Sequence, residues 1–202
     1  MKKLFILFLI ITSNNVLSQE LGDYYNSIDN KKAKDLKFGI RTPIDFKENI
    51  STNNNVVKSW SNNNINIEVI VEDVAKKYKK KTKNDWSEML KSKKFKLKGF
   101  HSNYKLITES KYFSVDNYPG LLFINDKPFK QNNSYEISIK VIVEGVYFTL
   151  IMYSENKEKL DSYVPLFYEL LNSVIFYDQY SNANPVVGKW KIIRETKGGS
   201  EK

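Results

Sequence analysis

The chain has 202 residues, a formal net charge of +9 and no cysteine. This length suits one compact domain with flanking tails and allows a sizeable hydrophobic core. The lack of cysteine excludes disulfides, thiolate metal sites and a lipid-modified N-terminal cysteine. The core alone must therefore hold the domain together.

The positive charge does not by itself indicate a nucleic-acid partner. Thirty of the 32 basic residues are lysine, whereas bidentate contacts to phosphates and bases favour arginine. Asparagine is also abundant, with runs at 53–55 and 62–64, and an AT-rich genome produces such an excess without selection for a partner. We therefore favour a compositional origin of the charge and expect no nucleic-acid binding.

Residues 1–18 have the layout of a bacterial secretory signal peptide. A charged start at residues 2–3 precedes an apolar run at 4–11, and small or modest residues stand at −3 and −1 of a cut before Gln19. The apolar run is far shorter than the ~20 residues that cross a bilayer. We predict a periplasmic or extracellular protein, with no transmembrane segment after the leader is removed.

Residues 19–35 are polar and show no hydrophobic period, so we predict a flexible lead-in there. A first strand is expected at 36–40 and should stop at Pro43, because proline cannot donate to a strand ladder. The next predicted elements are a loop at 47–55 and strands at 56–60 and 65–71, joined by a turn at 61–64. Side chains alternate in the second of these strands, which indicates a half-buried strand.

A helix is predicted at residues 85–93, where Trp86 and Leu90 belong to an apolar stripe of helical spacing. Asn84 or Asp85 can cap its first turn. The residues just before it are rich in lysine and too charged for a core. Beyond the helix we expect strands within 100–114 and at 121–124, then a polar loop at 127–133.

Residues 134–176 are the most informative stretch for the fold. Apolar and polar residues alternate from Tyr135 to Val143, and a second, more apolar strand follows Glu144-Gly145, which predicts a tight antiparallel hairpin. Apolar residues at helical spacing from Leu160 to Val174 then predict an amphipathic helix. Pro165 should kink this helix or delay its start, because it removes one backbone hydrogen bond. A short strand closes the module.

The second strand of this hairpin has two apolar faces. One face carries Val146, Phe148, Leu150 and Met152, which we assign to the core. The other, here called the tyrosine face, carries Tyr147, Thr149, Ile151 and Tyr153. It is too apolar for plain exposure to solvent. Either a second layer such as the Trp86 helix covers it, or it binds a peptide, glycan or lipid through its tyrosines.

The sequence contains no recognisable catalytic constellation, and we expect no cofactor and no metal. His101 is the only histidine, so neither a histidine-based triad nor a zinc site is expected. Ser154-Glu155-Asn156-Lys157 matches S-x-x-K, but the partner motifs S-D-N and K-T-G of that enzyme class are absent. We interpret Ser154 as the N-cap of the final helix.

Four features follow one another along residues 36–177. They are Phe38-Gly39-Ile40-Arg41-Thr42-Pro43 at the end of a strand, Pro119-Gly120-Leu121-Leu122, Gly145-Val146-Tyr147-Phe148 in the hairpin, and Ser173-Val174-Ile175-Phe176 after the last helix. In this order they resemble the PsbP-like family of exported domains. The resemblance implies one α+β domain, an α-β-α sandwich whose antiparallel sheet has about six or more strands packed with helices. Plant members of the family are accessory subunits of photosystem II, and the resemblance implies no catalytic residues.

Residues 178–202 are predicted to be a linker and a C-terminal tail. Within them Gly188-Lys189-Trp190 is similar to the opening strand of a lipocalin-like domain. A barrel needs about eight strands to close, and too few residues follow Trp190 for that. Either the similarity is accidental, or a second domain has been lost.

These observations predict an exported, non-catalytic binding or accessory protein of the periplasm or cell envelope. Its partner would be a protein, a peptide or a glycan. The alternative is an electrostatic binder of anionic lipid or polysaccharide on the envelope, acting through the lysine-rich stretch from Lys76 to Lys98.

Overall fold

The computed structural model describes residues 20–78, 80–92, 100, 107–125, 127–128 and 133–177. The predicted leader at 1–18, His101 and the tail at 178–202 lie outside the described residues. Among the helices that the structure describes, none is long and apolar enough to cross a bilayer.

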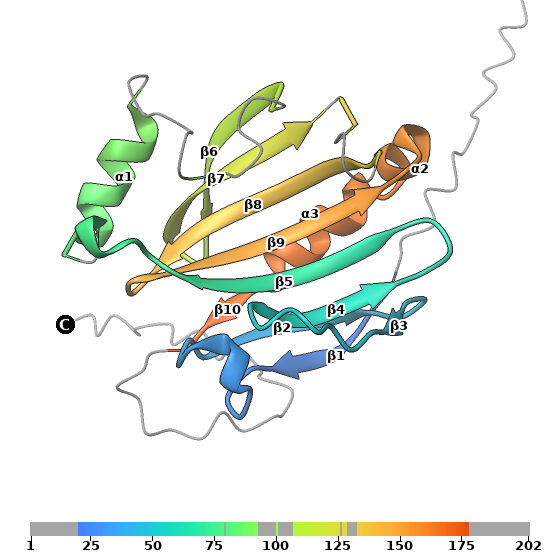
Figure 1. Cartoon of the computed structure of the whole chain (residues 1–202), viewed down its shortest axis with the longest axis horizontal. Coiled ribbons are helices and arrows are strands. Elements are labelled where there is room, and N and C mark those ends of the chain that lie inside the picture. Colours follow the sequence, from blue (N-terminus) through green and yellow to red (C-terminus); the bar gives the residue numbers. More distant parts are fainter. Residues whose placement is uncertain are drawn as a thin grey trace, which may run out of the picture.

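Seven antiparallel strands form the large sheet, in the order β3-β4-β5-β9-β8-β7-β6 (Figure 1). Their bounds are β3 Lys47–Glu48, β4 Val56–Ser61, β5 Asn66–Asp73, β6 Glu109–Val115, β7 Tyr118–Asn125, β8 Tyr135–Val143 and β9 Val146–Ser154. The predicted hairpin is β8 and β9. Glu144 and Gly145 form its two-residue turn with φ angles of 44° and 89°, the left-handed pair that a type I′ turn requires.

A second sheet has three strands, in the order β1-β2-β10: β1 Leu21–Asn26, β2 Phe38–Pro43 and β10 Ile175–Phe176. The prediction of a flexible lead-in at 19–35 is therefore wrong. This segment contains β1 and a short 3-10 helix, η1 Lys31–Ala33. Polar β1 is stable because it pairs with β2 and because Tyr25 packs on the ring of Phe38, at 6.1 Å between centroids. Neither contact is visible in a polar sequence without a period.

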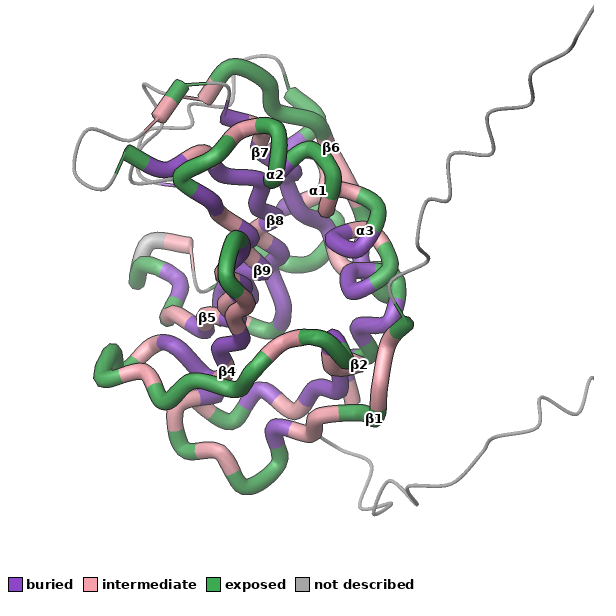
Figure 2. The backbone as a smooth tube through the Cα atoms, turned by 90° about the vertical axis from the view of Figure 1, so that its right-hand side faces the viewer, coloured by how far each residue is buried: buried purple, intermediate pink, exposed green. Residues whose placement is uncertain are grey.

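The main core lies between one face of the large sheet, the small sheet and two helices, α2 Lys157–Ser162 and α3 Val164–Asn172. The ring of Phe148 on β9 lies 5.1 Å from that of Phe38 on β2 and 5.2 Å from that of Phe176 on β10. This aromatic cluster joins the two sheets. Figure 2 shows the buried residues concentrated in the central strands and in α3. The assignment of Val146, Phe148, Leu150 and Met152 to the core is confirmed.

A second layer covers part of the opposite face of the large sheet. It contains α1 Lys83–Lys91, preceded by the 3-10 turn η2 Lys76–Tyr78. The helix starts two residues before the predicted position. Thr82, rather than Asn84 or Asp85, is its N-cap, and Thr82 and Asp85 form a reciprocal capping box.

The final helix is interrupted where Pro165 predicts. It divides at Tyr163 into α2 and α3, and Pro165 lies in the first turn of α3, where its missing N–H leaves no intrahelical bond unmade. An antiparallel sheet with helices packed on both faces is the predicted α+β fold class, which is confirmed.

Candidate functional site

One end of the tyrosine face is closed by the second layer. Tyr147 is 6% exposed, and its ring lies 6.3 Å from that of Trp86 on α1 and 5.3 Å from that of Phe100. Burial, followed by the proximity of Tyr78 and Glu72, raises the pKa of Tyr147 to about 12. Thr149 is also buried, and its hydroxyl finds no hydrogen-bond partner among the described residues. These two side chains are not free to meet a ligand.

Lys140 on β8 completes the closure of this end. Its ammonium lies 5.0 Å above the ring of Tyr147 and 3.1 Å from a carboxylate oxygen of Glu72. The cation, the ring and the carboxylate come from three adjacent strands, β8, β9 and β5. These contacts stabilise the sheet next to α1.

The other end of the tyrosine face is more open. Ile151 and Tyr153 are both partly exposed, and the Tyr153 hydroxyl donates to Glu68 on β5 at 3.2 Å. Burial, and then the charge of Glu68, raise the pKa of Tyr153 to about 12, and burial also raises the pKa of Glu68. For Ile151 and Tyr153, a role in binding stays a prediction.

Glu68→Gln is expected to stabilise the fold at pH 7 by about 0.5 kcal/mol at most, because the group is only partly buried and solvent screens it. The folded state holds the Glu68 proton more tightly than the unfolded state, so stability falls as the pH rises through the window above the unfolded pKa. The advantage of the variant should vanish below about pH 4. Thermal unfolding of the wild type and the variant at pH 7 and below about pH 4 measures this stability difference. An equal difference at both pH values would contradict a raised pKa of Glu68 in the folded state.

A shallow cavity of about 660 Å³ lies at the junction of the small sheet and α3. Its lining residues are Glu20, Leu21, Tyr24, Arg41, Glu169, Asn172 and Ser173, and we call it the Arg41 cavity. Two smaller cavities in the described part of the chain, of about 180 and 160 Å³, lie in the N-terminal half, one along η1 and the other along β3 and β4. The Arg41 cavity has the volume of a small-ligand site.

Hydrogen bonds hold both the guanidinium and the backbone N–H of Arg41 in place. Its Nε donates to the carbonyl of Gly22 at 2.9 Å and its Nη2 donates to the carbonyl of Leu21. The pairing of β1 with β2 shifts register at this point, which makes these carbonyls available. The backbone N–H of Arg41 donates to the Ser173 hydroxyl at 3.0 Å. A guanidinium has five N–H donors, so three remain for a ligand.

One lining residue of the cavity is an exposed tyrosine on the small sheet. Tyr24 pairs with Arg41 across β1 and β2 and is 48% exposed. A Cβ on Gly39 would lie 3.4 Å from the Tyr24 ring and 2.4 Å from the Tyr177 hydroxyl oxygen. Both rings therefore lie over the bare backbone of Gly39. Burial, and then the proximity of Tyr24, raise the pKa of Tyr177.

Sequence reasoning missed the Arg41 cavity. The available signals were a glycine inside an apolar strand, which marks a close approach of another group, and a Tyr-Tyr pair in a polar segment. The contact between Arg41 and Ser173 joins residues 132 positions apart, and no local pattern contains such a contact.

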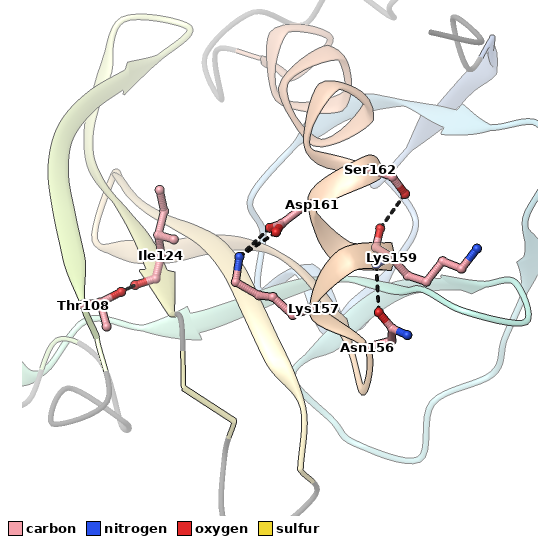
Figure 3. A network of polar contacts seen from close by, with 7 residues as sticks. All are labelled: Thr108, Ile124, Asn156, Lys157, Lys159, Asp161 and Ser162. Carbon is pink, nitrogen blue, oxygen red and sulfur yellow. Dashed lines mark hydrogen bonds and ion pairs between the residues drawn. The ribbon is translucent and has the colours of Figure 1, made fainter. Parts of the chain in front are cut away.

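The S-x-x-K match has a structural role. Ser154 ends β9, where its hydroxyl donates to the carbonyl of Asn64 at 2.7 Å and accepts from the Asn156 N–H. The interpretation of Ser154 as N-cap is wrong. Figure 3 shows Asn156 capping α2 through the Lys159 N–H, and Lys157 pairing with Asp161. The described residues hold no cluster of three or more histidine or carboxylate side chains fit for a metal ion.

No protein-family model matches this chain, and no curated protein matches it. Among solved structures, the chain is similar to the solution structure of cyanobacterial PsbP (CyanoP) from Synechocystis sp. PCC 6803. The TM-score is 0.47 at 12% identity, and the match covers 79% of this chain and 96% of that one. This likeness agrees with the PsbP-like resemblance of the sequence. Both values are too low to carry partners or activity over to this chain.

Proposed function

We propose that this chain is an exported, non-catalytic binding or accessory protein of the bacterial cell envelope. The observation that carries the proposal is the Arg41 cavity, an open site with a half-buried arginine already held in place. A side chain that is ordered before binding loses little conformational entropy when a ligand arrives. The described residues form no ion pair with Arg41, so its remaining donors are available.

The predicted cleavage site is close to the cavity in the sequence. Cleavage before Gln19 would make Glu20, which lines the cavity, the second residue of the mature chain. The N-terminus of the exported protein would then lie next to the cavity.

The test is the distribution of the full chain, leader included, between soluble periplasm and sedimented envelope in a bacterial host. The wild type should begin at Gln19, as mass spectrometry would show, and should sediment with the envelope. Combined Tyr24→Ala and Arg41→Ala replacements should release it at least about tenfold, as expected when central contacts are truncated. Ile50→Ser, at a 96% exposed apolar position, is the control. A double variant that sediments like the wild type would refute the proposal.

The electrostatic alternative has its own supporting observation. Lys76, Lys80 and Lys81 are exposed near the start of α1, and the described residues form no ion pair with them. If they held the protein on an anionic surface, sedimentation would collapse at 1 M salt, where the screening length is only about 3 Å. Replacing the three lysines by glutamine would have the same effect. Sedimentation that survives both treatments would remove the alternative.

A further inference from the structure

We propose that the ligand of the Arg41 cavity is a neutral glycan, a short stretch of envelope polysaccharide that lies against Tyr24. This inference rests on the proposed function, because it names the class of partner for the same site. It follows from the shape of the cavity, its polar groups, its charges and the exposed aromatic ring.

The shape favours an extended ligand over a peptide anchor. Strong peptide and protein anchors are aromatic or arginine side chains that fill closed, fully desolvated pockets. The Arg41 cavity is wide and shallow. Among its lining residues, Glu20, Tyr24, Glu169 and Asn172 are exposed. A volume of about 660 Å³ with such an open mouth suits a chain of sugar rings lying across it.

The polar groups match hydroxyls. Arg41 offers fixed donors, the carboxylates of Glu20 and Glu169 are acceptors, and the amide of Asn172 both donates and accepts. A sugar hydroxyl can donate and accept at the same time. Planar guanidinium and carboxylate groups can each contact two adjacent hydroxyls, and the lining presents both kinds.

The charges disfavour ionic ligands. Two carboxylates and one guanidinium line the cavity. An anion bound to Arg41 would lie in the same cavity as Glu20 and Glu169, and a cation bound to the carboxylates would lie in the same cavity as Arg41. Like charges placed together in this way oppose binding. A neutral ligand meets neither penalty.

Tyr24 supplies the apolar part of the contact. It is 48% exposed, and Gly39 lets its ring rest close to the sheet. Sugar rings carry C–H groups on one face that pack against an aromatic ring, and tyrosine gives this contact with little loss of rotamer freedom. Ile175, 42% exposed and paired with Gly39, extends the same face.

The test treats the envelope before the purified full chain is added to it. Periodate, which cleaves vicinal diols of sugars, should reduce sedimentation at least about tenfold, whereas protease should leave it unchanged. On untreated envelope, Tyr24→Phe should retain binding within about threefold. Tyr24→Ala and Glu169→Arg should each reduce binding to the envelope about tenfold or more, as expected when a central contact is truncated or blocked. Glu169 is exposed on α3, so Glu169→Arg blocks the cavity without altering β1 or β2.

Direct titration gives a second measurement. In a panel of neutral tri- to hexasaccharides of glucose, mannose and galactose whose ring residues carry vicinal diols, at least one should bind the wild type, and it should bind the Glu169→Arg variant more weakly. Loss of sedimentation with protease but not periodate, while Tyr24→Ala still releases the chain, would overturn the glycan and leave the proposed function standing. Failure of both Tyr24→Ala and Glu169→Arg to change sedimentation would overturn both.

Discussion

Replacement of Phe148 by alanine is expected to destabilise the fold by about 3–5 kcal/mol, the usual range for a buried phenylalanine. Phe148 is fully buried and packs on Phe38 and Phe176. Its truncation would leave a cavity between the two sheets. Since a typical domain is stable by only about 5–15 kcal/mol, much of the stability would be lost. Urea denaturation at 25 °C measures the loss in the free energy of unfolding. The dependence of that free energy on urea concentration should be the same in the variant and the wild type.

The matched control for Phe148→Ala is Ile50→Ala. Ile50 is 96% exposed, so its truncation should change stability by no more than about 0.5 kcal/mol. If Phe148→Ala cost less than about 1 kcal/mol, the small sheet would not be joined to the large sheet through this cluster.

Replacement of Trp86 by alanine is expected to release α1 while the main core stays folded. Trp86 is buried in a cluster separate from the main core, with Leu90, Phe100 and Tyr147 among its members. Losing about 3 kcal/mol of contacts should raise amide exchange in α1 about a hundredfold. Strands β8 and β9 should keep their protection. Glu88→Ala, at an exposed position of the same helix, is the control.

The Trp86→Ala variant should also change the pKa of Tyr147. Burial holds its pKa near 12 in the folded protein, and uncovering the ring should return the pKa toward its ordinary value of about 10. The sign follows from linkage: the stabilising effect of neutral Tyr147 is present below pH 10 and is lost as the pH rises toward 12. An ultraviolet titration of Trp86→Ala follows this shift. An unchanged titration with protected α1 amides would contradict the role assigned to Trp86.

The sequence predicted those parts of the fold that depend on residues close together in the chain, such as the β8–β9 hairpin and the break in the last helix. The turn at Glu144 and Gly145 needs two left-handed residues, and its two-residue length specifies the register of β8 on β9, with Val143 opposite Val146. Pro165 marks the division of the last helix because proline has no backbone N–H to donate within a helix. Segment β1 was missed because its order comes from pairing with β2, which a polar sequence does not reveal.

The candidate site likewise has a part that the local sequence predicts and a part that depends on contacts between distant residues. Alternation correctly grouped Tyr147, Thr149, Ile151 and Tyr153 on one face, but only the packing of α1 decides which of them are covered. The Arg41 cavity has no sequence period at all. It forms because a register shift in β1, an arginine in β2 and the end of α3 meet in space.

Whether this protein binds through the Arg41 cavity can be decided by comparing two double variants in the envelope sedimentation experiment. One removes Tyr24 and Arg41, and the other replaces Ile151 and Tyr153, which are the open end of the tyrosine face, by serine. The first variant should leave the envelope, and the second should stay bound like the wild type. Retention of the first variant together with release of the second would refute binding through the Arg41 cavity and place binding on the tyrosine face.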